Sequence, residues 1–119
     1  MTKIIKTERR ISPRIAQQLP INVIANGYDF ATSTKNISCV GAYCRIAKYV
    51  PPFTKVNIKL NLPLADMHNR RGISVVECKG VIVRAEDEAS GGFNVAIFFN
   101  GITDSCRKKI SQYVNQFVS

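Results

Sequence analysis

The chain has 119 residues, of which 45% are hydrophobic and 21% are charged. This size and composition are typical of one compact domain and exclude a disordered or fibrous chain. Seventeen basic residues against eight acidic ones give a formal net charge of +9, which favours an anionic partner. The longest apolar runs, such as residues 95–99, are too short to span a bilayer, and the basic N-terminus lacks the apolar stretch of a signal peptide. We therefore expect a cytoplasmic protein that does not insert into a membrane.

The cysteines predict neither a disulfide framework nor a metal site. They stand at Cys39, Cys44, Cys78 and Cys106, so no two of them have the C-x-x-C spacing. His68 is the only histidine that could join them as a ligand. We expect reduced thiols, most of them packed in the interior, and no zinc.

The first part of the chain is expected to be an arm that precedes the fold. Residues 1–14 carry five basic side chains and one acidic one, a local charge of +4, and they show no strand-like alternation. Pro13 also disfavours regular structure here. We predict a basic, mobile arm over residues 1–18 and one folded domain over residues 19–119, with order beginning near Leu19.

A hairpin is predicted at the start of the domain. Apolar residues recur at alternate positions from Ile21 to Ala25, and Asn26-Gly27 is a pair that favours a tight hairpin turn. Residues 56–62 show the clearest alternation, which predicts one face in a core and one face in water. Similar reasoning predicts strands at residues 21–25, 28–35, 42–46, 56–62, 74–84 and 93–99.

The connections between these strands have their own signals. Pro51-Pro52 breaks the chain before the fourth strand, and Gly80 inside the fifth strand predicts a bulge. We expect a loop over residues 64–72 and an acidic turn over residues 86–92.

A helix is predicted at the C-terminal end of the chain. Thr103 is a suitable N-cap, followed by Asp104, and apolar residues then recur at helical spacing. The expected buried face consists of Cys106, Ile110, Tyr113, Val114 and Phe117. Successive antiparallel strands leave exposed edges unless the sheet closes. We therefore predict a mainly β fold, a small closed antiparallel barrel with one face of the helix packed on it.

Three arginines cluster in the arm, in the sequence RRISPR at residues 9–14. They are Arg9, Arg10 and Arg14. Guanidinium groups bind phosphate oxygens and the O6/N7 edge of guanine through paired hydrogen bonds, and they stack on bases. Such a cluster suits a nucleotide. The alternative is a solvated basic arm that improves solubility.

A second polar motif, NISCVG at residues 36–41, lies between two predicted strands. Asn36 and Ser38 offer an amide and a hydroxyl group, and Gly41 permits either a positive φ or a close approach of a ligand to the backbone. A flat polar ligand edge could bind here. The alternative is an ordinary polar turn in which Asn36 or Ser38 bonds its own backbone.

Together the two motifs resemble the signature of the PilZ family, R-x-x-x-R followed about one hairpin later by D/N-x-S-x-x-G. Here the first half runs from Arg10 to Arg14 and the second from Asn36 to Gly41, in the same order. The resemblance extends to the predicted strands and helix and covers nearly the whole chain. It implies a six-stranded PilZ barrel whose N-terminal arm closes over cyclic di-GMP, with Arg10 and Arg14 on guanine edges and phosphates. By the same resemblance, guanine is bonded by Asn36 and Ser38, and Gly41 lets the ligand approach the backbone.

The resemblance also implies how many ligands bind. In the PilZ family, an arginine at the position of Arg9 accompanies two intercalated molecules of cyclic di-GMP, whereas a bulky apolar residue accompanies one. We therefore expect two cyclic di-GMP molecules per chain. Ordering of the arm over them would pass a signal to an unidentified protein effector.

Other functional classes fit the sequence less well. An enzyme is not expected, because His68 lies in a predicted loop and Cys39 has no paired histidine or second cysteine to activate it. A PilZ-like adaptor that acts through protein contacts without binding nucleotide stays open.

A small barrel that binds RNA or single-stranded DNA would also suit the charge. Such surfaces use exposed stacking aromatics, so nucleic acid is the less expected partner. The aromatic residues predicted to face the core are Phe93, Phe99, Tyr113 and Phe117. The placement of Tyr28, Phe30, Tyr43 and Phe53 stays open.

Overall fold

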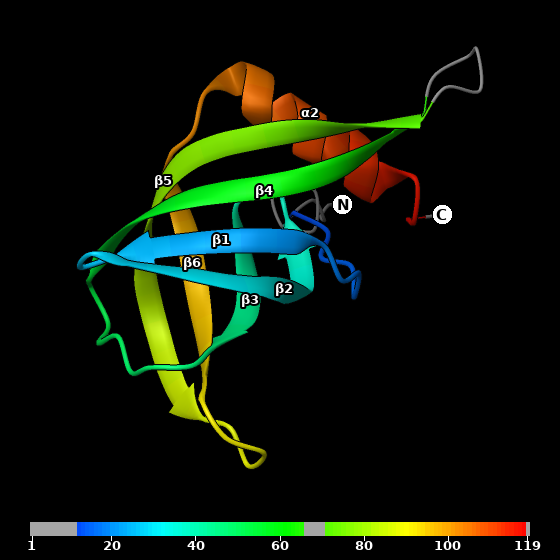
Figure 1. The fold of residues 1–119 in the computed structure, drawn as a ribbon. Helices are drawn as coiled ribbons and strands as arrows, with labels where there is room; N and C mark the ends of the chain where they lie inside the picture. The colour runs from blue at the N-terminus through cyan, green and yellow to red at the C-terminus, as the bar shows by residue number, and fades with distance from the viewer. Residues whose placement is uncertain (1–11, 66–70, 119) are drawn as a thin grey trace, which may run out of the picture.

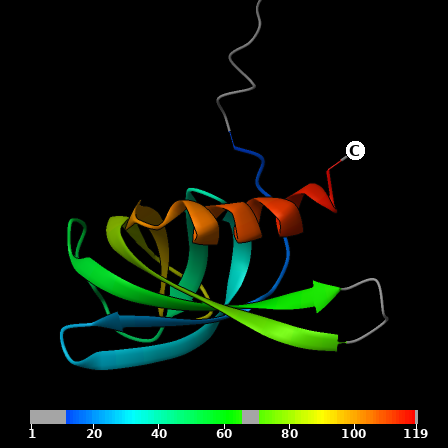
Figure 2. The same cartoon turned by 90° about the horizontal axis from the view of Figure 1, so that it is seen from above.

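A computed structural model describes residues 12–65 and 71–118 of the chain. Within these ranges six antiparallel strands close into a barrel in the order β1-β2-β3-β6-β5-β4 (Figure 1). One helix, α2, packs against β2, β4 and β5 (Figure 2). The elements are β1 Pro20–Ala25, β2 Tyr28–Ser38, β3 Gly41–Ile46, β4 Lys55–Ala65, β5 Arg71–Asp87, β6 Phe93–Gly101 and α2 Asp104–Asn115. The predicted six-stranded barrel with a C-terminal helix is confirmed.

The core is built from the inward-facing residues of the strands. In β4, Val56, Ile58, Leu60 and Leu62 are at most 3% exposed, while the residues between them face water or are half-buried. Each such side chain contributes roughly 1.5–3 kcal/mol when it leaves water. The alternation predicted for residues 56–62 is confirmed.

The first hairpin turns as the sequence predicts. Asn26 and Gly27 have φ of 52° and 83°, and Ala25 pairs with Tyr28 across the turn. Positive φ at both central residues matches the twist of the two strands, which is why Asn-Gly is favoured there.

All six strands are longer than predicted, and β2, β4 and β5 exceed their predicted lengths by three residues or more. β2 continues through Ser38, so Asn36 and Ser38 lie in a strand and not in a turn. The loop predicted over residues 64–72 is wrong at both ends, because β4 and β5 stay paired as far as Ala65 and Arg71. β4 also contains Pro63, which has no backbone N–H to donate. β4 pairs with β1 only as far as Leu60, so Pro63 has one neighbouring strand, β5. A proline is tolerated in such a segment.

The prediction that order begins near Leu19 also needs correction. Ile15 is 8% exposed and exchanges two backbone hydrogen bonds of 3.0 Å with Ile37. A single bridge of this kind has no repeating sequence pattern, so alternation could not indicate it. The described chain is therefore attached to the barrel four residues before the expected position.

The predicted bulge at Gly80 is confirmed, because the register between β5 and β6 shifts between Lys79 and Val81. A Cβ on Gly80 would lie 2.9 Å from Ile97 Cγ2 and 3.0 Å from Phe98 O. Glycine therefore allows β6 to approach β5 closely at the point where the ladder is irregular.

The helix begins as predicted but ends earlier. Thr103 Oγ1 accepts a hydrogen bond from the Cys106 N–H at 3.2 Å. The buried residues of α2 are Ile110, Tyr113 and Val114. Phe117 was placed wrongly on this face, because α2 ends at Asn115; its ring is 47% exposed and packs on Tyr113. Over the described ranges, no helix is long and apolar enough to cross a membrane.

The cysteines are free thiols in the fold. Cys44 and Cys78 are buried, whereas Cys39 and Cys106 are half-buried. Burial raises the pKa of Cys44 to about 12, and burial followed by repulsion from Cys106 raises the pKa of Cys78 to about 11. Both thiols therefore stay protonated at neutral pH and serve as packing groups.

Candidate functional site

A hollow of about 540 Å³ lies on the outer face of the barrel, over β3, β6 and β5. This volume falls within the roughly 300–1,000 Å³ of small-molecule sites. Arg14 of the N-terminal segment and Asn36 near the end of β2 both line it. The lining also includes Val40, Gly41, Tyr43, Val83, Arg84 and Phe98.

The structure joins the two sequence motifs at this hollow. Arg14 Nη1 donates a hydrogen bond of 2.8 Å to Asn36 Oδ1. One residue comes from the arginine motif and the other from the motif that follows the first hairpin. The contact leaves the remaining guanidinium donors and the Asn36 amide donors available to a polar ligand.

The segment that carries Arg14 is held on the barrel by side chains on both sides of it. Thr34 is fully buried, and its Oγ1 donates to Gln17 O at 2.6 Å and accepts from the Leu19 N–H at 2.9 Å. On the other side, Cys39 Sγ lies 3.3 Å from Ser12 Oγ as a hydrogen-bond donor. These bonds fix the position of Arg14. Sequence reasoning did not single out Thr34, because threonine is common in a Thr-rich strand.

Two of the predicted ligand residues, Arg9 and Arg10, lie outside the described residues. Their roles stay predictions.

Ser38 lies inside the protein and does not line the hollow. It is fully buried, and its Oγ accepts a hydrogen bond of 3.2 Å from the Val40 N–H. This geometry matches the alternative considered from the sequence, in which Ser38 bonds the neighbouring backbone. Val40 does line the hollow, so the buried Ser38 hydroxyl helps to position Val40 through this hydrogen bond.

Gly41 lines the hollow, and its lack of a side chain is required by the barrel. A Cβ at this position would clash with Ile97 O on β6. Gly41 is not among the described residues with positive φ. A close approach of two strands, and not an unusual backbone conformation, explains this glycine.

Arg84 is a site residue that sequence reasoning missed. Between Ile82 and Arg84 the register of β5 against β6 shifts by one residue, so Arg84 pairs with Ala96 while Ile82 pairs with Ile97. Without this bulge, simple alternation would turn Arg84 toward the core beside Ile82. The bulge instead leaves the Arg84 side chain 61% exposed at the hollow.

Tyr43 and Glu86 orient the Arg84 guanidinium. The guanidinium carbon lies 5.9 Å from the centre of the Tyr43 ring, and Arg84 Nε lies 3.4 Å from Glu86 Oε2. Tyr43 in turn donates from its hydroxyl to Glu86 Oε1 at 3.2 Å. A cation held beside an aromatic ring suits a ligand that has both negative charge and a flat π-face. Phe98 and Val83, each close to half exposed, add apolar surface beside them.

Comparison with protein families identifies the architecture. The family model described as PilZ domain matches residues 8–116. The chain belongs to the PilZ family. The match spans both motifs, the barrel and α2, and it confirms the resemblance noted in the sequence. No curated protein matches the chain.

Solved structures share the fold of this PilZ chain. The inhibitor of motility MotI/DgrA of Bacillus subtilis has a TM-score of 0.77 at 14% identity, over 98% of this chain and 53% of that one. The chain thus spans about half the length of MotI. The PilZ domain of YcgR from Escherichia coli, in a structure with c-di-GMP, has a TM-score of 0.60 at 10% identity, over 91% and 90% of the two chains.

Proposed function

We propose that this PilZ chain is a receptor for cyclic di-GMP that acts on a protein effector in the cytoplasm and is not an enzyme. The observation that carries the proposal is the hydrogen bond from Arg14 to Asn36 at the hollow, because it unites the two halves of the family signature. The YcgR domain, whose fold this chain shares, was solved with that ligand.

The chemistry of the hollow fits a guanine dinucleotide. Two phosphates need cations, and Arg14 and Arg84 supply them at the described part of the site. Two guanines need planar polar donors and π-faces, which Asn36, Tyr43 and Phe98 supply. Binding of this kind needs neither a nucleophile nor a metal, because no bond in the ligand is broken.

Arg9 and Arg10 complete the proposed site. Arg10 is two residues from Ser12, which contacts Cys39 within the second motif. We expect Arg10 to bind guanine edges and phosphates together with Arg14. Arg9 would serve a second cyclic di-GMP, because two stacked ligands bring four phosphates together and an extra cation offsets their repulsion.

Ser38 and Gly41 have supporting roles in the proposed mechanism. Ser38 accepts a hydrogen bond from the Val40 N–H, and Gly41 lets β3 lie close to β6. Both residues would therefore shape the surface of the hollow against which a guanine binds. Ligand binding would order the arginine arm over the hollow and change the surface that an effector meets.

Titration calorimetry of the purified chain tests the proposal. Cyclic di-GMP should bind with a stoichiometry of about two, and GMP and a short RNA should bind far more weakly at physiological salt, since nucleic-acid affinity depends steeply on ionic strength. No heat with cyclic di-GMP, together with salt-sensitive binding of the RNA, would replace this function with nucleic-acid binding.

A further inference from the structure

Phe53 has a backbone conformation that is unfavourable for a bulky residue. Residues 51–54 form a tight turn in which the Thr54 N–H bonds Pro51 O at 3.3 Å. Phe53 is the third residue of this turn and has a φ of 73°. A turn with proline second and a positive φ third is the type that favours glycine or asparagine at the third position. A bulky residue there is strained.

The side chain of Phe53 is also exposed to water. It is 83% exposed, more than any other large hydrophobic residue of the described chain. The fold uses its backbone, since the Phe53 N–H donates to Ile82 O at 2.6 Å, but it does not bury the ring. Glycine would make the same backbone bond without the strain. Fold stability therefore does not explain a phenylalanine here.

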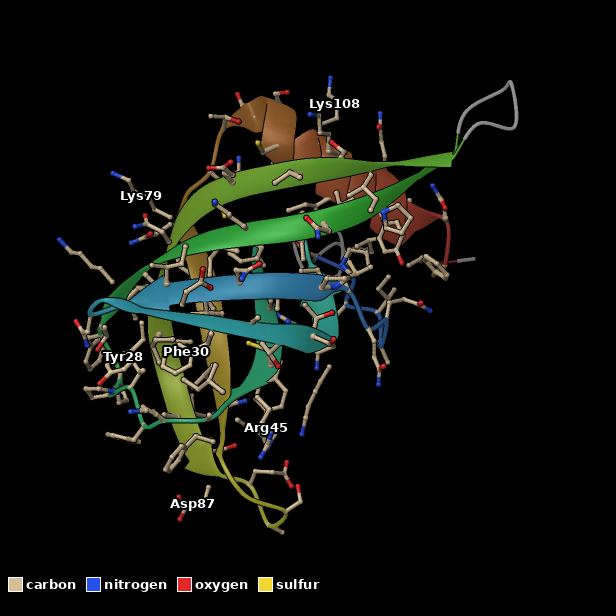
Figure 3. The ribbon with its side chains drawn as sticks, in the orientation of Figure 1. Tyr28, Phe30, Arg45, Lys79, Asp87 and Lys108 are labelled. Atoms are coloured by element: carbon tan, nitrogen blue, oxygen red, sulfur yellow. The ribbon has the colours of Figure 1, made fainter. Side chains whose placement is uncertain are left out.

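A basic recess begins two residues after Phe53 in the chain. Lys55, two residues further on, lines a recess of about 400 Å³ together with Asn57, Lys79 and Asn100. Lys55 and Lys79 are exposed, and among the described residues neither has a carboxylate within ion-pair distance. Figure 3 shows the Lys79 side chain reaching away from the barrel. Phe53 thus precedes Lys55 by two residues, and Lys79 stands two residues from the partner of Lys55 on the neighbouring strand β5.

We propose that Phe53, Lys55 and Lys79 form a docking surface for a folded protein partner, which offers an apolar pocket for the Phe53 ring and carboxylates at the rim of that pocket. Exposed aromatic side chains that enter a partner's pocket dominate many protein interfaces. Charges around such an anchor steer the encounter and fix the register. We call these three residues the Phe53 surface.

A protein fits this surface better than a single nucleic-acid strand. Strand binding needs several aromatic rings with open faces. Tyr28 is already stacked on Phe30, as Figure 3 shows, and Lys48 Nζ lies 4.6 Å from the centre of its ring. The rings of Tyr49 and Phe93 pack edge to face. Unlike these four rings, Phe53 has no aromatic or cationic partner among the described residues, which suits insertion of its ring into a pocket.

The Phe53 surface is separate from the proposed nucleotide site. Phe53, Lys55 and Lys79 are not among the residues that line the first hollow, and the hollow and the recess share no lining residue. The inference therefore stands independently of nucleotide binding. It identifies where the chain meets a protein, whichever small molecule controls the contact.

A first experiment asks whether Phe53 serves the fold. Phe53→Gly should melt at the same temperature as the wild-type protein or higher, because it relieves strain and removes little buried surface. Its affinity for cyclic di-GMP should be unchanged. A melting temperature lowered by more than about 5 °C, roughly 1 kcal/mol for a domain of this size, would show a structural role. A weakened nucleotide affinity would assign Phe53 to the nucleotide site. Either result would overturn the proposal.

A second experiment looks for the partner directly. A benzophenone amino acid placed at position 53 in the native host cells should cross-link to one protein on illumination, whereas the same group at Ile73, another exposed apolar position, should not. The purified partner should bind wild-type protein and lose at least about tenfold in affinity for Phe53→Gly and for Lys55→Glu. Ile73→Ser is the matched control and should bind normally.

Three other outcomes of these experiments would contradict the proposal. Absence of a cross-link specific to position 53 would mean that no protein docks there. A cross-link to a second copy of the chain, with a Phe53-dependent dimer in sedimentation, would make the surface a self-association site. Binding of a fluorescent oligothymidylate that Phe53→Gly abolishes would make it a nucleic-acid site.

Discussion

Arg14 and Asn36 are 22 positions apart in sequence and are joined by a hydrogen bond of 2.8 Å at the edge of the outer hollow. The bond forms because the Thr34 hydroxyl and the backbone of Ile37 hold the N-terminal segment along β2. The arginine motif therefore reaches the second motif through specific contacts of the barrel, and the two residues should act as a unit.

The first prediction tests this unit. Arg14→Ala should weaken cyclic di-GMP binding by roughly 10- to 100-fold, since losing a hydrogen bond from a charged group costs about 1.5–3 kcal/mol. Asn36→Ala should weaken it less, and the double variant should lose less than the sum of the two losses because the residues are in contact. Calorimetry measures all three affinities. Arg107→Ala, on the exposed face of α2, should bind normally; full additivity of the two losses would argue against coupling.

The second prediction concerns Arg84, which the bulge in β5 turns toward the hollow. Arg84→Ala should lower the affinity for cyclic di-GMP by about tenfold or more while the melting temperature stays unchanged, because the side chain is exposed and its ion pair with Glu86 contributes little to stability. Glu86→Gln is the matched variant and should keep or increase the affinity by removing a negative charge. Normal binding by Arg84→Ala would exclude it from the site.

The third prediction concerns stoichiometry. Arg9→Leu should reduce the number of bound cyclic di-GMP molecules from two toward one, because the extra cation is needed mainly to offset the repulsion between stacked ligands. Calorimetry at concentrations well above the dissociation constant gives the ratio. A ratio of one in the unaltered protein would defeat the prediction of two ligands and leave the receptor proposal standing.

The fourth prediction concerns the attachment of the N-terminal segment. Thr34→Val keeps the shape of a fully buried side chain but removes the hydroxyl that bonds Gln17 O and the Leu19 N–H. Unpaired backbone groups of this kind cost about 1–3 kcal/mol, so the free energy of unfolding should fall by that order. Hydrogen exchange at the Leu19 amide should accelerate more than exchange within β4. Ser33→Ala, on the exposed side of the same strand, should change neither quantity.

The fifth prediction concerns the β5–β6 turn and pH. Hydrogen bonds to Glu88 from the Lys35 ammonium, then from Asn94 and the Ser90 N–H, lower the pKa of Glu88 from 4.5 to about 2. A carboxyl with a lowered folded-state pKa adds stability that is present above its unfolded value. This stability is lost as the pH falls from about 4.5 toward about 2.

Thermal melts over pH 2–7 test that prediction. At neutral pH the wild-type protein should have a higher melting temperature than the Glu88→Gln variant. This difference in melting temperature should shrink through the acid range as Glu88 takes up a proton. Asp87→Asn, one residue earlier in the same region, is the control and should not reproduce this pattern. A difference that does not vary with pH would assign the effect of Glu88→Gln to packing.

Sequence patterns alone determined the features that depend on neighbouring residues. Asn26-Gly27 specified a turn with two positive φ values, the alternation in residues 56–62 specified one buried face, and Thr103 specified the start of α2. The paired motifs also indicated the family, because they depend on residue types and order. These features follow from local sterics and from the period of a strand or helix.

The tertiary structure decided the features that depend on which strands meet. The bulge that turns Arg84 outward exists only in the register of β5 against β6, and the glycine at position 41 is explained only by the nearness of Ile97 O. Ser38 is drawn into the interior because β2 runs further than its sequence predicts. Contacts of this kind join residues distant in the chain. No local pattern encodes them, because register is set by the packing of the closed barrel as a whole.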